Sequence, residues 1–74
     1  MMDTTELQML HSLVKEERRK AFIELIKWTT HIKTLSPGDS ALSAALDESK
    51  KARENLDVYT QELKRINEEL GSNP

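Results

Sequence analysis

Cysteine is absent from this 74-residue sequence, and glycine and proline occur only twice each. The lack of cysteine excludes a disulfide framework and a cysteine-based zinc site. Charged residues make up 32% of the chain and hydrophobic residues 36%. With so little glycine and proline, this balance is typical of long exposed helices rather than of strands or disordered chain. We therefore expect an all-α protein.

Long hydrophobic runs are also absent. No apolar run approaches the roughly 18 residues that a membrane span needs. The N-terminal sequence MMDTTELQ has neither the basic start nor the apolar core of a secretory signal. A net charge of −2 argues against a protein whose main task is to wrap nucleic acid. The expected location is the cytoplasm, without membrane contact.

A chain of this length forms one domain at most, and it struggles to bury enough apolar surface to be stable alone. Disulfides and cysteine-bound zinc are unavailable, so oligomerisation or a partner protein must supply further burial. We therefore expect this chain to associate.

The first half of the chain has the pattern of one long helix. Asp3 and Glu6 have the spacing of a capping box, so the helix is expected to begin near Thr4 and to end near residue 34. Apolar residues then recur at intervals of three, four or seven, which places them on one face of the helix. The expected inner face consists of Leu7, Leu10, Val14, Ala21, Leu25, Trp28 and Ile32.

Residues 35–39 contain the turn signals Pro37 and Gly38, and Gly38 is expected to let the chain reverse. A second helix over about residues 40–70 follows, with an a/d heptad repeat sustained over four heptads. Its expected inner face consists of Leu42, Ala45, Ala52, Leu56, Tyr59, Leu63, Ile66 and Leu70. Gly71 stands where a left-handed cap would end the helix, and residues 71–74 are expected to fray.

Because the turn is short, the two helices must be antiparallel neighbours. The predicted fold is a single domain over residues 1–74, an antiparallel two-helix coiled-coil hairpin. Matching the two arms about the turn places Trp28 opposite the small residues Ala45 and Ser49, as close packing requires.

Phe22 and Ile26 lie outside the inner face of the first helix, on the same side as Thr29. An apolar centre with a basic rim is typical of a contact surface. The residues expected at this interface are Phe22, Ile26, Thr29, Lys15, Arg18, Arg19 and Lys33. The simplest cover is a second copy, which would form a four-helix bundle, and the next is a helix of another protein. The sequence leaves open whether two copies would pair parallel or antiparallel.

Three polar residues of the first helix, Glu17, Glu24 and His31, follow one another at intervals of seven. Metal-binding bundles use a Glu and a His three residues apart, so we expect a solvated face and no metal or cofactor. His11, with Lys15 one turn later, resembles the site of histidine phosphotransfer domains. No acidic residue follows this histidine and no nucleotide-binding domain is present, so we expect a boundary histidine. We predict that the protein is not an enzyme.

The predicted function is a non-catalytic protein–protein interaction module, an adaptor, assembly factor or small chaperone-like protein. The six residues Pro37 to Leu42, placed between two helices, are similar to the turn of type III secretion needle subunits. That resemblance implies an alternative role as a needle-like or co-chaperone-like component of a secretion apparatus, although the needle family's apolar C-terminal tail is missing. The basic residues of the first helix leave a second alternative, a small dimeric nucleic-acid-binding regulator.

Overall fold

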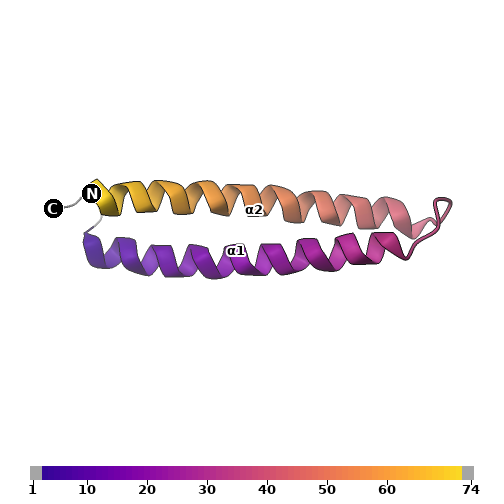
Figure 1. The fold of residues 1–74 in the computed structure, drawn as a ribbon, viewed down its shortest axis with the longest axis horizontal. Helices are drawn as coiled ribbons and strands as arrows, with labels where there is room; N and C mark the ends of the chain where they lie inside the picture. The colour runs from indigo at the N-terminus through magenta and orange to yellow at the C-terminus, as the bar shows by residue number, and fades with distance from the viewer. Residues whose placement is uncertain (1–2, 73–74) are drawn as a thin grey trace.

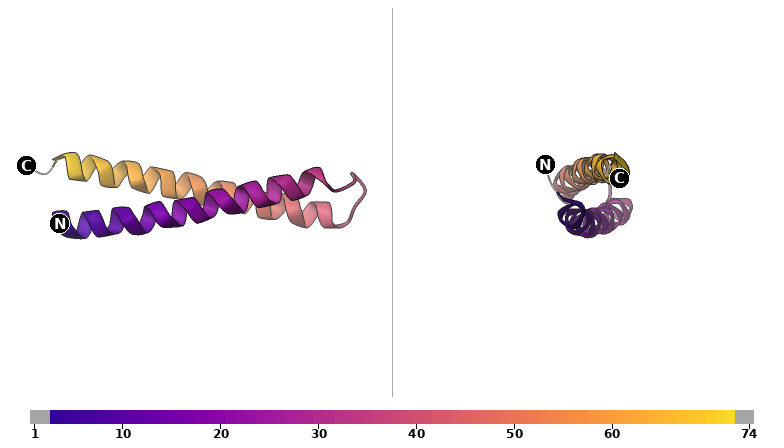
Figure 2. Two further views of the ribbon diagram at one scale, coloured as in Figure 1. Left: turned by 60° about the horizontal axis from the view of Figure 1, so that its bottom comes forward. Right: turned by 90° about the vertical axis from the view of Figure 1, so that its left-hand side faces the viewer.

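Two long helices form an antiparallel hairpin. The computed structural model describes residues 3–72, in which α1 spans Thr4–Lys33 and α2 spans Ala41–Ser72. The helices lie side by side along a rod of 57 × 14 × 13 Å, with the start of α1 and the end of α2 at the end opposite the turn (Figure 1). They cross one another along the rod, as Figure 2 shows from a second direction. The predicted all-α hairpin is confirmed at this level.

The start of α1 is held by an aspartate cap. Asp3 has extended backbone, and its carboxylate accepts a hydrogen bond from the Glu6 N–H at 2.8 Å. The Asp3 carbonyl accepts the first helical bond, from the Leu7 N–H at 3.0 Å. An aspartate at this position satisfies a backbone donor that would otherwise lack a partner. The helix therefore begins at Thr4.

Thr34 caps the other end of α1. Its N–H and its hydroxyl both donate to the His31 carbonyl, the hydroxyl at 2.7 Å. In the turn that follows, the Asp39 N–H donates to the Ser36 carbonyl at 3.0 Å. The Asp39 carboxylate then accepts from the Ala41 N–H at 2.9 Å, at the start of α2. A second aspartate therefore satisfies a backbone donor at the start of the second helix.

The chain reverses around Gly38 as the sequence predicts, but no glycine of the described chain has a positive φ. Gly38 needs no left-handed conformation, since the seven residues 34–40 spread the reversal over successive hydrogen-bonded turns. Gly71 does not cap α2, which continues through it to Ser72. Nothing lies within 4 Å of a side chain added at Gly71, so no packing contact forces the chain out of the helix there. Of the tail expected to fray, residues 73–74 lie outside the described residues.

The core is a single seam between the helices. Every residue that the sequence places on an inner face is buried or half-buried. Fully buried positions are Leu7 and Ala21 of α1 and Ala45, Ser49, Ala52 and Ile66 of α2. Small residues account for four of these six positions, which lets the helices approach closely. Within the described residues, neither helix has a stretch apolar enough to cross a membrane.

Removal of a buried seam side chain should destabilise the hairpin. Ile66 is only 2% exposed, so Ile66→Ala should lower the free energy of unfolding by about 2 to 5 kcal/mol. Gln61→Ala, at an exposed position on the side of the same helix that points away from the seam, should change it by no more than about 0.5 kcal/mol. Urea unfolding followed by circular dichroism at equal protein concentration measures both. Equal losses in the two variants would contradict this assignment of the seam.

Candidate interaction surface

Phe22 and Ile26 lie on the surface of the hairpin, 51% and 50% exposed. Each directly follows a seam residue, Ala21 or Leu25. One step along a helix turns by about 100°, so both side chains lie to one side of the seam. Thr29, which follows Trp28, lies on the same side and is also exposed.

A hydrogen bond between the helices shows which part of α2 shares this side. The Arg18 Nε donates to the Thr60 hydroxyl at 2.9 Å, and that hydroxyl donates to the Leu56 carbonyl at 2.7 Å. Arg18 lies one turn before Phe22, and Thr60 directly follows the seam residue Tyr59. In this antiparallel pair, the residues that follow seam residues therefore lie on one common side of the hairpin. We call this side the Phe22 flank.

The Phe22 flank has a third large apolar residue, which the sequence analysis missed. Leu46 is 51% exposed and directly follows the buried Ala45. It lies two heptads before Thr60, so it shares the side that Thr60 marks. Its position in the sequence could have revealed it, because Leu46 directly follows the seam residue Ala45, just as Phe22 directly follows the seam residue Ala21.

Basic side chains surround these apolar residues. Although α2 is acidic overall, it contributes three basic residues and only one acidic residue, Asp57, to the Phe22 flank. The basic residues of the flank are Lys15, Arg18, Lys33, Lys50, Arg53 and Lys64, which gives a formal charge of +5. Within the part of the chain that the structure describes, none of the six makes an ion pair. Their charge is therefore not compensated by ion pairs within the described chain.

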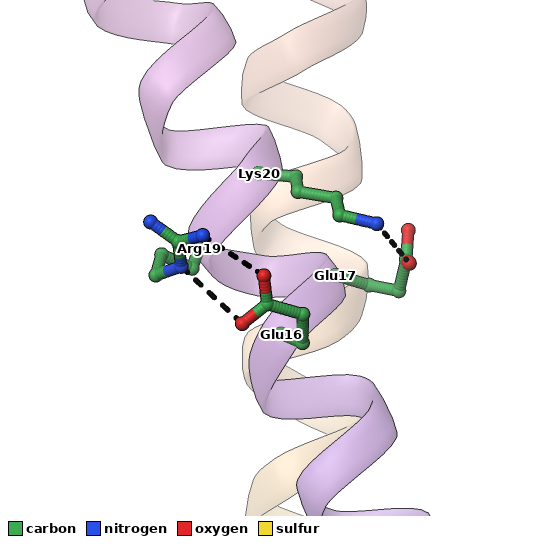
Figure 3. Close-up of polar contacts among 4 residues, drawn as sticks. All are labelled: Glu16, Glu17, Arg19 and Lys20. Carbon is green, nitrogen blue, oxygen red and sulfur yellow. Dashed lines mark hydrogen bonds and ion pairs between the residues drawn. The ribbon is translucent and has the colours of Figure 1, made fainter.

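Arg19, predicted at the same interface, is instead engaged by its own helix. Its Nη2 donates to Glu16 Oε1 at 2.9 Å and its Nε to Oε2 at 3.3 Å (Figure 3). This hydrogen bonding, together with the positive charge of Arg19, lowers the pKa of the Glu16 carboxyl, and the carboxylate raises the pKa of Arg19. Arg19 therefore offers a partner less net charge than the six basic residues of the Phe22 flank.

The opposite side of the hairpin has apolar residues of its own, also missed by the sequence analysis. Met9, Leu13 and Val58 each directly precede a seam residue, and all three are more than half exposed. We call this side the Leu13 flank. Its acidic residues are Glu6, Glu17, Glu24, Glu48, Glu62 and Glu69, and its basic residues are Lys20, Lys27, Lys51 and Arg65, which gives a formal charge of −2.

Ion pairs within each helix occupy most of the basic residues of the Leu13 flank. Lys20 lies 3.3 Å from Glu17, as Figure 3 shows, Lys51 lies 3.4 Å from Glu48, and Arg65 lies 2.7 Å from Glu62. The Phe22 flank has no such pairs among its described residues. The two flanks therefore differ in the sign of their charge and in how far that charge is compensated.

The polar row Glu17, Glu24 and His31 does not converge on a site. Glu24 accepts a hydrogen bond from the Trp28 indole at 3.1 Å, and the His31 ring lies edge-on to that indole with centroids 5.9 Å apart. Glu17 pairs with Lys20. No group of three or more metal-ligating side chains occurs among the described residues. His11 is half-buried, in a shallow groove beside Asn67 and Leu70.

No protein-family model, curated protein or solved structure matches this chain.

Arg19→Gln should raise the pKa of Glu16 toward the ordinary value of 4.5, because the hydrogen bonds and the positive charge that stabilise its carboxylate are removed. The ion pair forms above the lowered pKa and is lost as the pH falls through it. A pH titration of the carboxyl carbon by NMR measures the shift. Arg18→Gln is the matched control and should leave Glu16 unchanged, since Arg18 bonds Thr60 instead. An unchanged Glu16 in Arg19→Gln would contradict the assignment.

Proposed function

We propose that this chain is a non-catalytic protein–protein interaction module that works through the Phe22 flank. The observation that carries the proposal is the exposure of Phe22, Ile26 and Leu46 together on a side whose basic residues make no ion pair with any residue that the structure describes. Large apolar side chains surrounded by charge are the usual anatomy of an interface. An adaptor, an assembly factor or a small chaperone-like protein would use such a surface.

Self-association is part of this proposal. A two-helix hairpin has no third layer to cover the Phe22 flank, and a chain of 74 residues gains stability from any partner that binds only its folded state. A second copy would build a four-helix bundle as a homodimer, and another protein is the further partner. Location in the cytoplasm belongs to the same proposal, whereas the secretion-apparatus alternative remains a prediction from the turn sequence.

A second candidate function is nucleic-acid binding, and the observation that favours it is the charge of +5 on the Phe22 flank. Six basic residues without ion pairs could contact phosphates. A gel shift with duplex RNA and duplex DNA tests this candidate. We expect no retardation, because the remaining surface is acidic. Binding that appears at low salt and falls steeply as salt rises would favour this candidate over the interaction module.

Phe22→Glu should leave the helix content unchanged and weaken association by at least about thirtyfold, because it places a charge at the centre of the apolar surface. Circular dichroism measures the helix content, and sedimentation velocity at several concentrations measures the association.

Ile23→Glu is the matched control. Ile23 is 48% exposed and adjacent in sequence, but it points away from the seam rather than to the Phe22 flank. Its association should equal that of the unmodified chain. Equal association of Phe22→Glu and the unmodified chain would refute the proposed surface, and so would an unmodified chain that stays monomeric at every concentration.

A further inference from the structure

The proposed function leaves the Leu13 flank without a role, although Met9, Leu13 and Val58 are the three most exposed large apolar residues of the described chain. A dimer formed by two Phe22 flanks would leave this second apolar surface uncovered. It would also oppose a charge of +5 with another +5, and like charges across an interface are unfavourable. The Leu13 flank, at −2, has the opposite sign.

The apolar residues of the two flanks have matching spacings. Phe22 and Ile26 are four residues apart on α1, and so are Met9 and Leu13. Each flank adds one residue from α2, Leu46 or Val58. Each flank therefore has a pair of side chains one helical turn apart on α1 and a single side chain on α2.

The positions of these residues along the rod also match. The ends of the helices are level (Figure 1), and because α1 spans Thr4–Lys33 and α2 spans Ala41–Ser72, a residue n of α2 lies about level with residue 75 − n of α1. Val58 is then level with about residue 17 and Leu46 with about residue 29. A second copy can lie antiparallel on the first in two alignments. One sets Val58 of the second copy between Phe22 and Ile26 of the first, and the other sets Leu46 of the first copy between Met9 and Leu13 of the second. These two alignments differ by only one residue, about 1.5 Å.

One antiparallel alignment therefore satisfies both contacts, with each single side chain set into the gap of a facing pair, as in ridges-into-grooves packing. The two copies then overlap over all but about 5 Å of each hairpin. A parallel alignment also brings the apolar residues of the two flanks together. It does so only when one copy is shifted by about 20 Å along the other, which uncovers much of each flank. The antiparallel alignment buries more surface. It also places the half of one copy that contains the turn, residues 21–53 with a formal charge of +1, over the half of the other copy that contains the open end, with a formal charge of −3.

We propose that copies of this chain stack antiparallel, with the Phe22 flank of one copy docked on the Leu13 flank of the next. This inference rests on the proposed function and names the surface that the Phe22 flank binds. Because the two contacting surfaces differ, the copy at one end of the stack still has a free Phe22 flank and the copy at the other end still has a free Leu13 flank. Assemblies of the unmodified chain therefore grow beyond two copies as concentration rises.

A mixing experiment tests the proposal. Phe22→Glu disables one flank and leaves the Leu13 flank intact, whereas Leu13→Arg disables the other and leaves the Phe22 flank intact. Both positions are exposed, so both variants should fold, as circular dichroism checks. By sedimentation velocity, each variant alone should be monomeric, and an equimolar mixture should form dimers and nothing larger. The unmodified chain should exceed the mass of a dimer.

Other outcomes overturn the proposal in distinguishable ways. Dimers of Leu13→Arg alone would show that two Phe22 flanks pair with each other, which overturns the stack and leaves the proposed function intact. A monomeric mixture of two variants would overturn the stack as well. An unmodified chain that never associates would overturn both the stack and the proposed function.

The lack of cysteine in the chain allows the orientation to be tested by crosslinking. Met9→Cys is added to the Phe22→Glu chain, and Leu46→Cys to the Leu13→Arg chain. Oxidation of the mixture should join the two chains by a disulfide, since the antiparallel alignment brings residues 9 and 46 together. A disulfide formed only when Val58→Cys replaces Met9→Cys would overturn the antiparallel orientation.

Discussion

Packing of two helices along one seam is the constraint on which the rest of this structure depends. A rod 14 × 13 Å in cross-section has room for a single layer of contact between the helices. Each helix can bury one face, and every other face meets solvent or a partner. Small residues such as Ala21, Ala45 and Ala52 fill the centre of the seam, while larger ones such as Trp28 and Tyr59 lie half-exposed at its margins.

This constraint leaves apolar residues at positions next to the seam exposed on the surface. A residue that follows a seam position lies on one side of the hairpin, and a residue that precedes it lies on the other. Phe22, Ile26 and Leu46 lie on the first side, and Met9, Leu13 and Val58 on the second. The hairpin therefore has an exposed apolar surface on each side, and each surface combines residues of both helices.

The charges of the hairpin affect specificity more than stability. Surface ion pairs such as Arg65 with Glu62 contribute little to the free energy of folding, on the order of 0 to 1 kcal/mol each. They nevertheless compensate three of the four basic residues of the Leu13 flank, so its acidic excess remains. On the Phe22 flank the basic residues keep their full charge. Electrostatic complementarity of this kind guides which surfaces meet.

Hydrophobic periodicity along each helix was enough to predict the two helices, the residues of the seam and the exclusion of Phe22 and Ile26 from it. The capping role of Asp3 was also readable, since it depends on residues three apart. The continuation of α2 through Gly71 was not, because whether a glycine ends a helix depends on the contacts around the helix end.

Only the tertiary structure decided which parts of the two helices form one surface. Periodicity describes each helix separately and says nothing about the side of α2 that adjoins Phe22. The bond from Arg18 to Thr60 settles this point, and with it the addition of Leu46, Lys50, Arg53 and Lys64 to the Phe22 flank. The physical reason is that a flank is a property of two right-handed helices packed in opposite directions, and it exists only once they are paired.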